Sequence, residues 1–269
     1  MFEIARLQAQ LRYGASQAFQ AISVQPFKFY FNPDDDSLYS NYAIPDAPED
    51  GDLGKAITAL KAAFHERQRT PRLEYLEDFA PDLAAALEAN GFRQEIRTLL
   101  MVCTPDSFRP APDVPGLVIH PIDSTSPIED QRAAVTVQSR SFRSEDALEA
   151  TEEKVHQYFA RFASQQMFLA KLDGQAVSVA SLMPAYDGIA EIAGVGTVSA
   201  FRRRGIGAAI TGYAARVAFE QGLEAIFLTA ADERAGRVYT RVGFQGMGMS
   251  SLNYPYIHRI LKEILQVRG

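Results

Sequence analysis

The stretch "FRRRGIGAAI", residues 201–210, places three consecutive arginines before a Gly-x-Gly and a helix-forming apolar run. A predicted strand, residues 189–198, runs into this stretch, and residues 206–221 are predicted to form a helix. The first backbone N–H groups of a helix lack partners within the helix and lie at the positive end of its dipole. Glycine lets an anion approach these groups, and arginine adds charge and paired donors. The stretch therefore predicts a pyrophosphate site at a strand-to-helix junction.

Two better-known phosphate loops do not account for this stretch. The sequence contains no GxxxxGK[ST], and Gly207 is followed by Ala-Ala-Ile, so the pattern GxGxxG fails as well. Upstream, "GVGTV" contains Gly194 and Gly196, which either let backbone or substrate approach closely or mark a bulge. An isolated Gly-x-Gly is also typical of a plain turn with solvated arginines. A second motif is needed to decide between these alternatives.

Composition limits the classes of function. The chain has 269 residues, of which 47% are hydrophobic, and this suffices for one large domain or two small ones. A net charge of −6 argues against the broad basic surface needed to bind nucleic acid or an anionic membrane, so neither partner is expected. With Cys103 as the single cysteine, and four histidines without metal-binding spacing, neither a disulfide nor a metal site is expected. The N-terminal segment lacks an unbroken apolar run, so a cytoplasmic location is expected.

Hydrophobic periodicity predicts α/β organisation in both halves of the chain. Four prolines in residues 104–116 predict a linker between the halves. In the first half, helices are predicted at residues 4–22, 53–68 and 81–91, strands at 24–32, 72–76 and 92–103, and an acidic, turn-rich loop at 32–52. In the second half, helices are predicted at residues 127–142, 151–163, 206–221 and 233–242, and strands at 117–122, 189–198, 225–230 and 244–254, with a hairpin in 167–186 turning at Asp173-Gly174.

Two segments carry weaker signals. The acidic runs "NPDDD" and "PEDGD" lack the complete pattern of a calcium loop and are interpreted as solvated turns. The C-terminal tail has an apolar stripe that is expected to pack on its own body rather than on a partner helix; it consists of Ile257, Ile260, Leu261, Ile264 and Leu265.

An internal repeat relates the two halves. Residues 72–92 and 224–244 align without a gap, each as a strand, a helix and a Gly-Phe that enters another strand. Extending the alignment upstream with one gap places Glu49 and Asp52 opposite Arg202 and Gly205. The first copy therefore has acidic residues where the second has arginine and glycine.

Two ordered motifs carry a family resemblance. Arg202-x-x-Gly205-x-Gly207 resembles the [Q/R]-x-x-G-x-[G/A] signature of the GCN5-related N-acetyltransferase (GNAT) superfamily. Downstream, "DERAGRVYTRVGF" is similar to the second block of that family, with Ala235, Tyr239, Gly243 and Phe244 in register. The resemblance covers residues 117–254 well and extends to residues 72–103 only through the repeat.

The resemblance implies an α/β (α+β layered) fold of two GNAT-like domains, each a mixed, mostly antiparallel sheet flanked by helices. We expect a degenerate copy at residues 1–110 and a catalytic domain at residues 111–269. In the first copy, Leu87 aligns with Tyr239 and Ala80 aligns with Asp232. The first copy would support the active domain or form a wall of the acceptor site.

The resemblance also implies acetyl-CoA as co-substrate. Glu191 would act as the base and Tyr239 as the proton donor to the coenzyme sulfur; the alternatives are a solvated strand-edge carboxylate and an aromatic packed in the core. Asp232 stands where the family usually has Asn, so a carboxylate replaces the amide that often contacts the coenzyme arm. The coenzyme-binding residues implied are Val195, Gly196, Thr197, Val198, Arg202, Arg203, Arg204, Gly205, Ile206, Gly207, Ala208, Asp232, Ala235 and Tyr239.

The function expected from these motifs is transfer of an acetyl group from acetyl-CoA to a primary amine of a small molecule by direct attack. Alternatives are a non-enzymatic acetyl-CoA sensor, transfer of a longer acyl chain, and acetylation of a protein amine. The sequence leaves the acceptor and a homodimer open, because acceptor loops carry no readable code.

Overall fold

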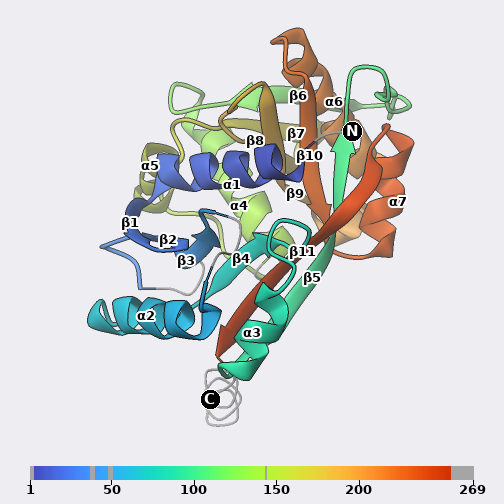
Figure 1. Ribbon diagram of the computed structural model, residues 1–269. Helices are drawn as coiled ribbons and strands as arrows, with labels where there is room; N and C mark the ends of the chain where they lie inside the picture. The colour runs from blue at the N-terminus through green and yellow to red at the C-terminus, as the bar shows by residue number, and fades with distance from the viewer. Residues whose placement is uncertain (1–2, 37–39, 48–50, 143, 256–269) are drawn as a thin grey trace. The chain divides into compact units, whose positions relative to one another are not determined.

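The computed structural model describes residues 3–36, 40–47, 51–142 and 144–255 (Figure 1), so the apolar stripe of the C-terminal tail lies outside the described residues. The chain forms two compact units. Unit 1 comprises the residues up to Leu100 and those from Met247 onward, and unit 2 comprises Met101–Gly246. The expected division near residue 110 is a single boundary, whereas the structure divides the chain twice. The second division arises because strand β11 (Gln245–Pro255) pairs antiparallel with β4 (Leu73–Leu76) of unit 1.

Unit 1 is a sheet with helices on both faces. Phe29 stacks on Phe64 of one helix with ring centroids 3.7 Å apart, whereas the next residue, Tyr30, packs in a cluster with Ala15 of another helix. Since successive strand residues point to opposite faces, the two helices cover opposite faces. The strand order is β1 (Gln20–Val24), β2 (Phe27–Phe31), β3 (Asn41–Pro45), β4, β11, β5 (Phe92–Cys103), and the helices are α1 (Ile4–Ala18), α2 (Leu53–Glu66) and α3 (Leu83–Ala89).

Two predictions in the first half were wrong. The predicted helix over residues 4–22 ends at Ala18, and Gln20–Val24 forms strand β1, which pairs antiparallel with β2. Strand β3 lies within the segment predicted to be an acidic loop. A five-residue strand between turn-rich segments has too little periodicity of its own to be recognised. It is fixed instead by antiparallel pairing with β2 and by burial of Ala43 and Ile44.

Unit 2 has the same plan, with a mostly antiparallel sheet between two helical layers. Phe168 belongs to the core cluster that includes the helix residue Ile210, whereas its neighbour Met167 packs with Val137 and Val155 on the opposite face. The strand order is β10 (Ala225–Ala230), β9 (Ile189–Thr197), β8 (Gln175–Leu182), β7 (Gln166–Leu172), β6 (Leu117–Ile122), and the helices are α4 (Ile128–Phe142), α5 (Glu152–Arg161), α6 (Ile206–Glu220) and α7 (Glu233–Arg241).

The predicted α/β class is confirmed, and the elements of the second half lie where they were predicted. In both units an antiparallel run ends in one parallel pair, β3 with β4 and β9 with β10. The strand–helix–strand order of the repeat recurs as β4-α3-β5 and β10-α7-β11. Among the described residues, no helix combines the length and the apolar character needed to cross a membrane.

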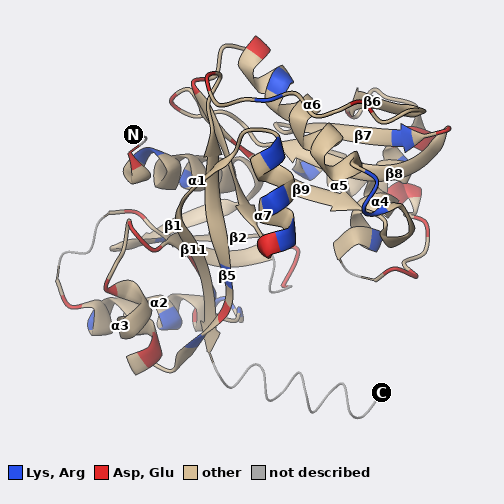
Figure 2. Cartoon of the chain, turned by 90° about the vertical axis from the view of Figure 1, so that its right-hand side faces the viewer, with Lys and Arg blue, Asp and Glu red and all other residues tan. Residues whose placement is uncertain are grey.

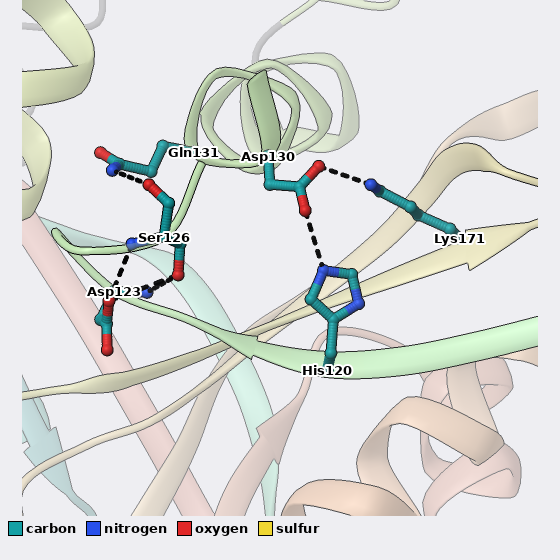
Figure 3. Close-up of polar contacts among 6 residues, drawn as sticks. All are labelled: His120, Asp123, Ser126, Asp130, Gln131 and Lys171. Atoms are coloured by element: carbon teal, nitrogen blue, oxygen red, sulfur yellow. Dashed lines mark hydrogen bonds and ion pairs between the residues drawn. The ribbon is translucent and has the colours of Figure 1, made fainter. Parts of the chain in front are cut away.

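A polar cluster fixes the start of α4 to the edge of the sheet in unit 2 (Figure 3). Asp130 accepts hydrogen bonds from Lys171 Nζ on β7, at 2.5 Å, and pairs with His120 Nε2 on β6, at 3.2 Å. These contacts, chiefly the hydrogen bond from Lys171, lower the pKa of Asp130 below its ordinary value. Gln131 also donates to the carbonyl of Ser126, at 2.7 Å. The anchored helix then runs across the sheet to β9, where the candidate site lies.

We expect Gly243→Ala to destabilise the protein far more than Gly174→Ala. Both glycines have positive φ, 100° and 84°, so each alanine adds strain of about 1–2 kcal/mol. At Gly243 the new Cβ would also collide with the backbone of Ser107 and Phe108, whereas at Gly174 it would meet open space. Overpacking of this kind adds about 1–3 kcal/mol. Urea denaturation followed by circular dichroism measures both variants, and equal losses of stability would contradict the collision.

Candidate functional site

The candidate site begins where β9 leaves β10. The parallel register of these strands starts at Ile189 with Ala225 and ends at Glu191 with Phe227. Strand β9 nevertheless continues to Thr197, and β10 to Ala230. From Ile192 onward, the backbone of β9 on this side therefore has no strand partner in β10. Unpaired backbone donors and acceptors of this kind can pair with an extended chain.

Two glycines shape this unpaired edge. In the register of β8 with β9, Val179 faces Gly196 and Ser181 faces Ala193, so β9 has one extra residue and forms a bulge. Gly194 lies in the bulge with φ of 61°. Gly196 has no room for a side chain, since a Cβ would lie 2.6 Å from Ser141 Cβ of α4. Each of the two alternatives therefore applies to one glycine: Gly194 marks a bulge, and Gly196 allows the close approach of a helix.

The turn after β9 presents free backbone amides. Helix α6 begins after Gly205, which has φ of 83° and provides no side-chain cap. The first bond of the helix is Ala209 N to Gly205 O, at 3.0 Å. Among the described residues, the amides of Ile206, Gly207 and Ala208 have no hydrogen-bond acceptor. These donors, at the positive end of the helix dipole, suit an anion such as a pyrophosphate.

The three arginines of the turn are exposed but have different surroundings. Arg202 donates through Nε to the carbonyl of Thr197, at 2.9 Å, and so braces the turn against the end of β9. The guanidinium of Arg204 lies over the ring of Phe201, 5.2 Å from its centroid. Arg203 has φ of 64°. The turn itself therefore leaves Arg203 as its most available cation.

Helix α7 supplies the predicted tyrosine. Asp232 is the N-cap of α7 and accepts a hydrogen bond from Ala235 N, at 2.8 Å. Tyr239 is 8% exposed and packs against Phe244, and its hydroxyl has no hydrogen bond within the described part of the chain. Burial, followed by the nearby Asp232 carboxylate, raises the pKa of Tyr239 to about 12. The phenol is therefore protonated at neutral pH and can donate a proton.

The structure brings most of the predicted coenzyme-binding residues to one edge of unit 2. A Cβ on Gly207 would lie 3.7 Å from Val238 of α7 and 3.9 Å from Thr197 Oγ1 of β9, so the turn, the strand and the helix meet there. Glu191 lies apart, at the other end of the unpaired edge. Glu191 and Thr197 are six residue steps apart on β9, which corresponds to about 20 Å of strand. A ligand that reaches both ends must be long and extended.

Sequence reasoning missed several residues that support this site. The Ser178 hydroxyl on β8 donates to the carbonyl of Gly196, at 2.7 Å, and lies 2.9 Å from Thr197 Oγ1. Ser141 and Phe142 of α4 fill the space beside Gly196. These contacts join separate strands and helices and leave no local signal. The capping role of Asp232 did have a local sequence signal, because Asp before a predicted helix is typical of an N-cap.

In unit 1, the helix start that corresponds to the arginine-glycine turn is capped by a side chain of the protein itself. Asp52, aligned with Gly205 in the repeat, is the N-cap of α2 and accepts a hydrogen bond from Lys55 N, at 3.1 Å. This bond is the largest cause that lowers the pKa of the Asp52 carboxyl. A carboxylate thus takes the place at the helix N-terminus that an anionic ligand would need.

Residues 133–244 match the family model described as the acetyltransferase (GNAT) family. The chain contains a GNAT-family acetyltransferase domain. The family to which this domain belongs transfers acyl groups and generally uses acetyl-CoA. The recognition of the GNAT superfamily from the two motifs is confirmed.

Solved structures share the fold over most of the chain. A GCN5-related N-acetyltransferase from Kribbella flavida is 26% identical, with a TM-score of 0.78 over 95% of this chain and 96% of that chain. A GCN5-related N-acetyltransferase from Sphaerobacter thermophilus is 17% identical, with a TM-score of 0.59 over 85% of this chain and 80% of that chain. A tandem GNAT protein from the clavulanic acid biosynthesis pathway is 16% identical, with a TM-score of 0.57 over 84% of this chain and 78% of that chain. No curated protein matches the chain.

We expect the stability of the protein to fall between pH 10 and pH 12 in part because of Tyr239. Its folded pKa, about 12, exceeds the ordinary value of 10, so the unfolded chain loses this proton first as the pH rises. Urea denaturation at pH 9 and pH 11 should show a smaller loss of stability in Tyr239→Phe than in the wild type. Tyr30, with a pKa also raised to about 12 by burial, still contributes in both proteins. Identical losses in the two proteins would contradict the raised pKa.

Proposed function

We propose that unit 2 transfers an acetyl group from acetyl-CoA to the primary amine of a small molecule by direct attack. One observation carries the proposal: free helix amides and Glu191 lie at opposite ends of an unpaired strand edge. Acetyl-CoA has the matching form, with a pyrophosphate and a thioester joined by a long arm that carries amides.

The residues present suit this co-substrate. The amides of Ile206, Gly207 and Ala208, with Arg203, would hold the pyrophosphate. The backbone from Val195 to Val198 would pair with the amides of the arm, and Gly207 leaves the approach open. When bound, acetyl-CoA supplies an acetyl group activated as a thioester. Asp232 and Ala235 bond to each other, so we assign them to the support of α7 rather than to direct coenzyme contact.

Two side chains would manage the protons of the reaction. Glu191, where the strands diverge, would accept a proton from the attacking amine, either directly or through water. As the new C–N bond forms and the C–S bond breaks, the Tyr239 hydroxyl would give its proton to the departing sulfur. Because the pKa of Tyr239 is raised, the hydroxyl is protonated at neutral pH and the proton is present when the sulfur departs. Solvent would then restore the proton on Tyr239.

We propose further that residues 1–110 are a degenerate GNAT copy and that residues 111–269 are the catalytic one. The repeated strand–helix–strand order and the shared parallel pair in each unit support this relationship. The side-chain cap of Asp52 supports the loss of phosphate binding in the first copy. A fold shared with a protein described as a tandem GNAT protein agrees with this arrangement. The chain would then bind one acetyl-CoA.

We expect Tyr239→Phe and Glu191→Gln each to lower kcat by about 10²- to 10⁴-fold, because each removes one proton-transfer group. Coenzyme affinity, measured by calorimetry, should change less than about threefold, since neither side chain is assigned to the pyrophosphate site. Full activity in both variants would contradict these roles. A wild type that binds acetyl-CoA but acetylates no amine would favour a coenzyme sensor.

We expect Gly205→Asp to abolish acetyl-CoA binding and Gly205→Asn to retain part of it. Both side chains tolerate positive φ better than most residues do, and both can cap α6, but only Asp brings a negative charge to the phosphate site. The Asp variant would copy the arrangement at Asp52. Calorimetric titration gives the two affinities, and circular dichroism checks the fold. Equal binding by the two variants would contradict a phosphate at this turn.

A further inference from the structure

Helix α7 carries a run of arginines in a chain whose net charge is −6. Figure 2 shows basic residues along α7, with an acidic residue at its start. Arg234, Arg237 and Arg241 are all exposed. Neither the proton transfers nor the pyrophosphate contacts proposed above use them.

The packing of α7 places two of these arginines beside the phosphate turn. Val238 contacts the start of α6, since its Cγ1 lies 3.7 Å from where a Cβ on Gly207 would be. Arg234 precedes Val238 by four residues and Arg241 follows it by three, so both share its face of the helix. They lie about 6 Å and about 4.5 Å along the axis from Val238. The two arginines therefore lie on the face of α7 that meets the start of α6, one on each side of Val238.

Within the part of the chain that the structure describes, these two arginines differ from their neighbours in their ion pairs. Arg237, on the neighbouring side of the helix, pairs with Glu233, at 3.4 Å. Arg234 and Arg241 form no ion pair with any residue that the structure describes. At the turn, by contrast, Arg202 bonds to Thr197 and Arg204 covers Phe201. Two exposed, uncompensated guanidinium groups next to an anion site favour a second anionic group on the same ligand.

We propose that Arg234 and Arg241 bind the ribose 3′-phosphate of CoA and so determine specificity for CoA over 3′-dephospho-CoA. This inference rests on the proposed function. CoA has two phosphates in its pyrophosphate and a third on its ribose. The amides of α6 account for the pyrophosphate, and the third phosphate needs cations within reach of the same turn. Guanidinium groups on both sides of Val238 meet that need.

The test is calorimetric titration with CoA and with 3′-dephospho-CoA at low ionic strength. It compares the wild type with Arg234→Gln/Arg241→Gln, in which two exposed charges are removed without deleting a buried group. Arg216→Gln is the control. This exposed arginine of α6 pairs with Glu220, at 2.8 Å, and lies ten residues beyond Ile206, about 15 Å along the helix.

We expect the wild type and Arg216→Gln to bind CoA about 10- to 100-fold more tightly than 3′-dephospho-CoA, as for charge-assisted hydrogen bonds. In the double variant this preference should fall to less than about threefold, through weaker CoA binding with unchanged binding of 3′-dephospho-CoA. A wild type without preference, or a double variant that keeps it, overturns the inference and leaves the proposed function standing. Failure of the wild type to bind either ligand overturns both.

Discussion

The parallel pairing of β9 with β10 stops at Glu191 and Phe227, and the organisation of the site follows from that divergence. Had the ladder continued, the backbone of β9 would be satisfied by β10, and no extended ligand could pair with it. The divergence also separates a carboxylate at its start from the helix amides at its end. Binding and chemistry can therefore occupy the two ends of one strand.

Glycine makes this geometry attainable. Gly194 absorbs a bulge, Gly196 admits α4 against the strand, and Gly205 turns the chain into α6 with a left-handed backbone. Helix α4 is in turn held at its other end by the pairing of Asp130 with His120 and Lys171. The edge that would receive a ligand is thus supported from the back by packing and hydrogen bonds that the ligand itself does not touch.

Charge placement distinguishes the two units more clearly than their folds do. At aligned helix starts, unit 1 has Asp52 bonded to its own helix amides, whereas unit 2 has Gly205 and no side-chain cap. The same scaffold is therefore self-capped in one unit and open to an anion in the other. A net charge of −6 does not prevent an anion from binding at the turn of unit 2. Screening by salt limits the electrostatic influence on that anion to the charges and dipoles close to the turn.

The sequence predicts the elements of the second half, the hairpin at Asp173-Gly174, the arginine-glycine turn and the family, because periodicity, turn residues and helix starts are encoded within a few neighbouring residues. It did not determine strand β3, the pairing of β11 with β4, the contact of Ser178 with Gly196 or the burial that raises the pKa of Tyr239. Each of these depends on which distant segments meet, and a local pattern does not specify a partner. They are fixed by long-range pairing and by the exclusion of water in the folded chain.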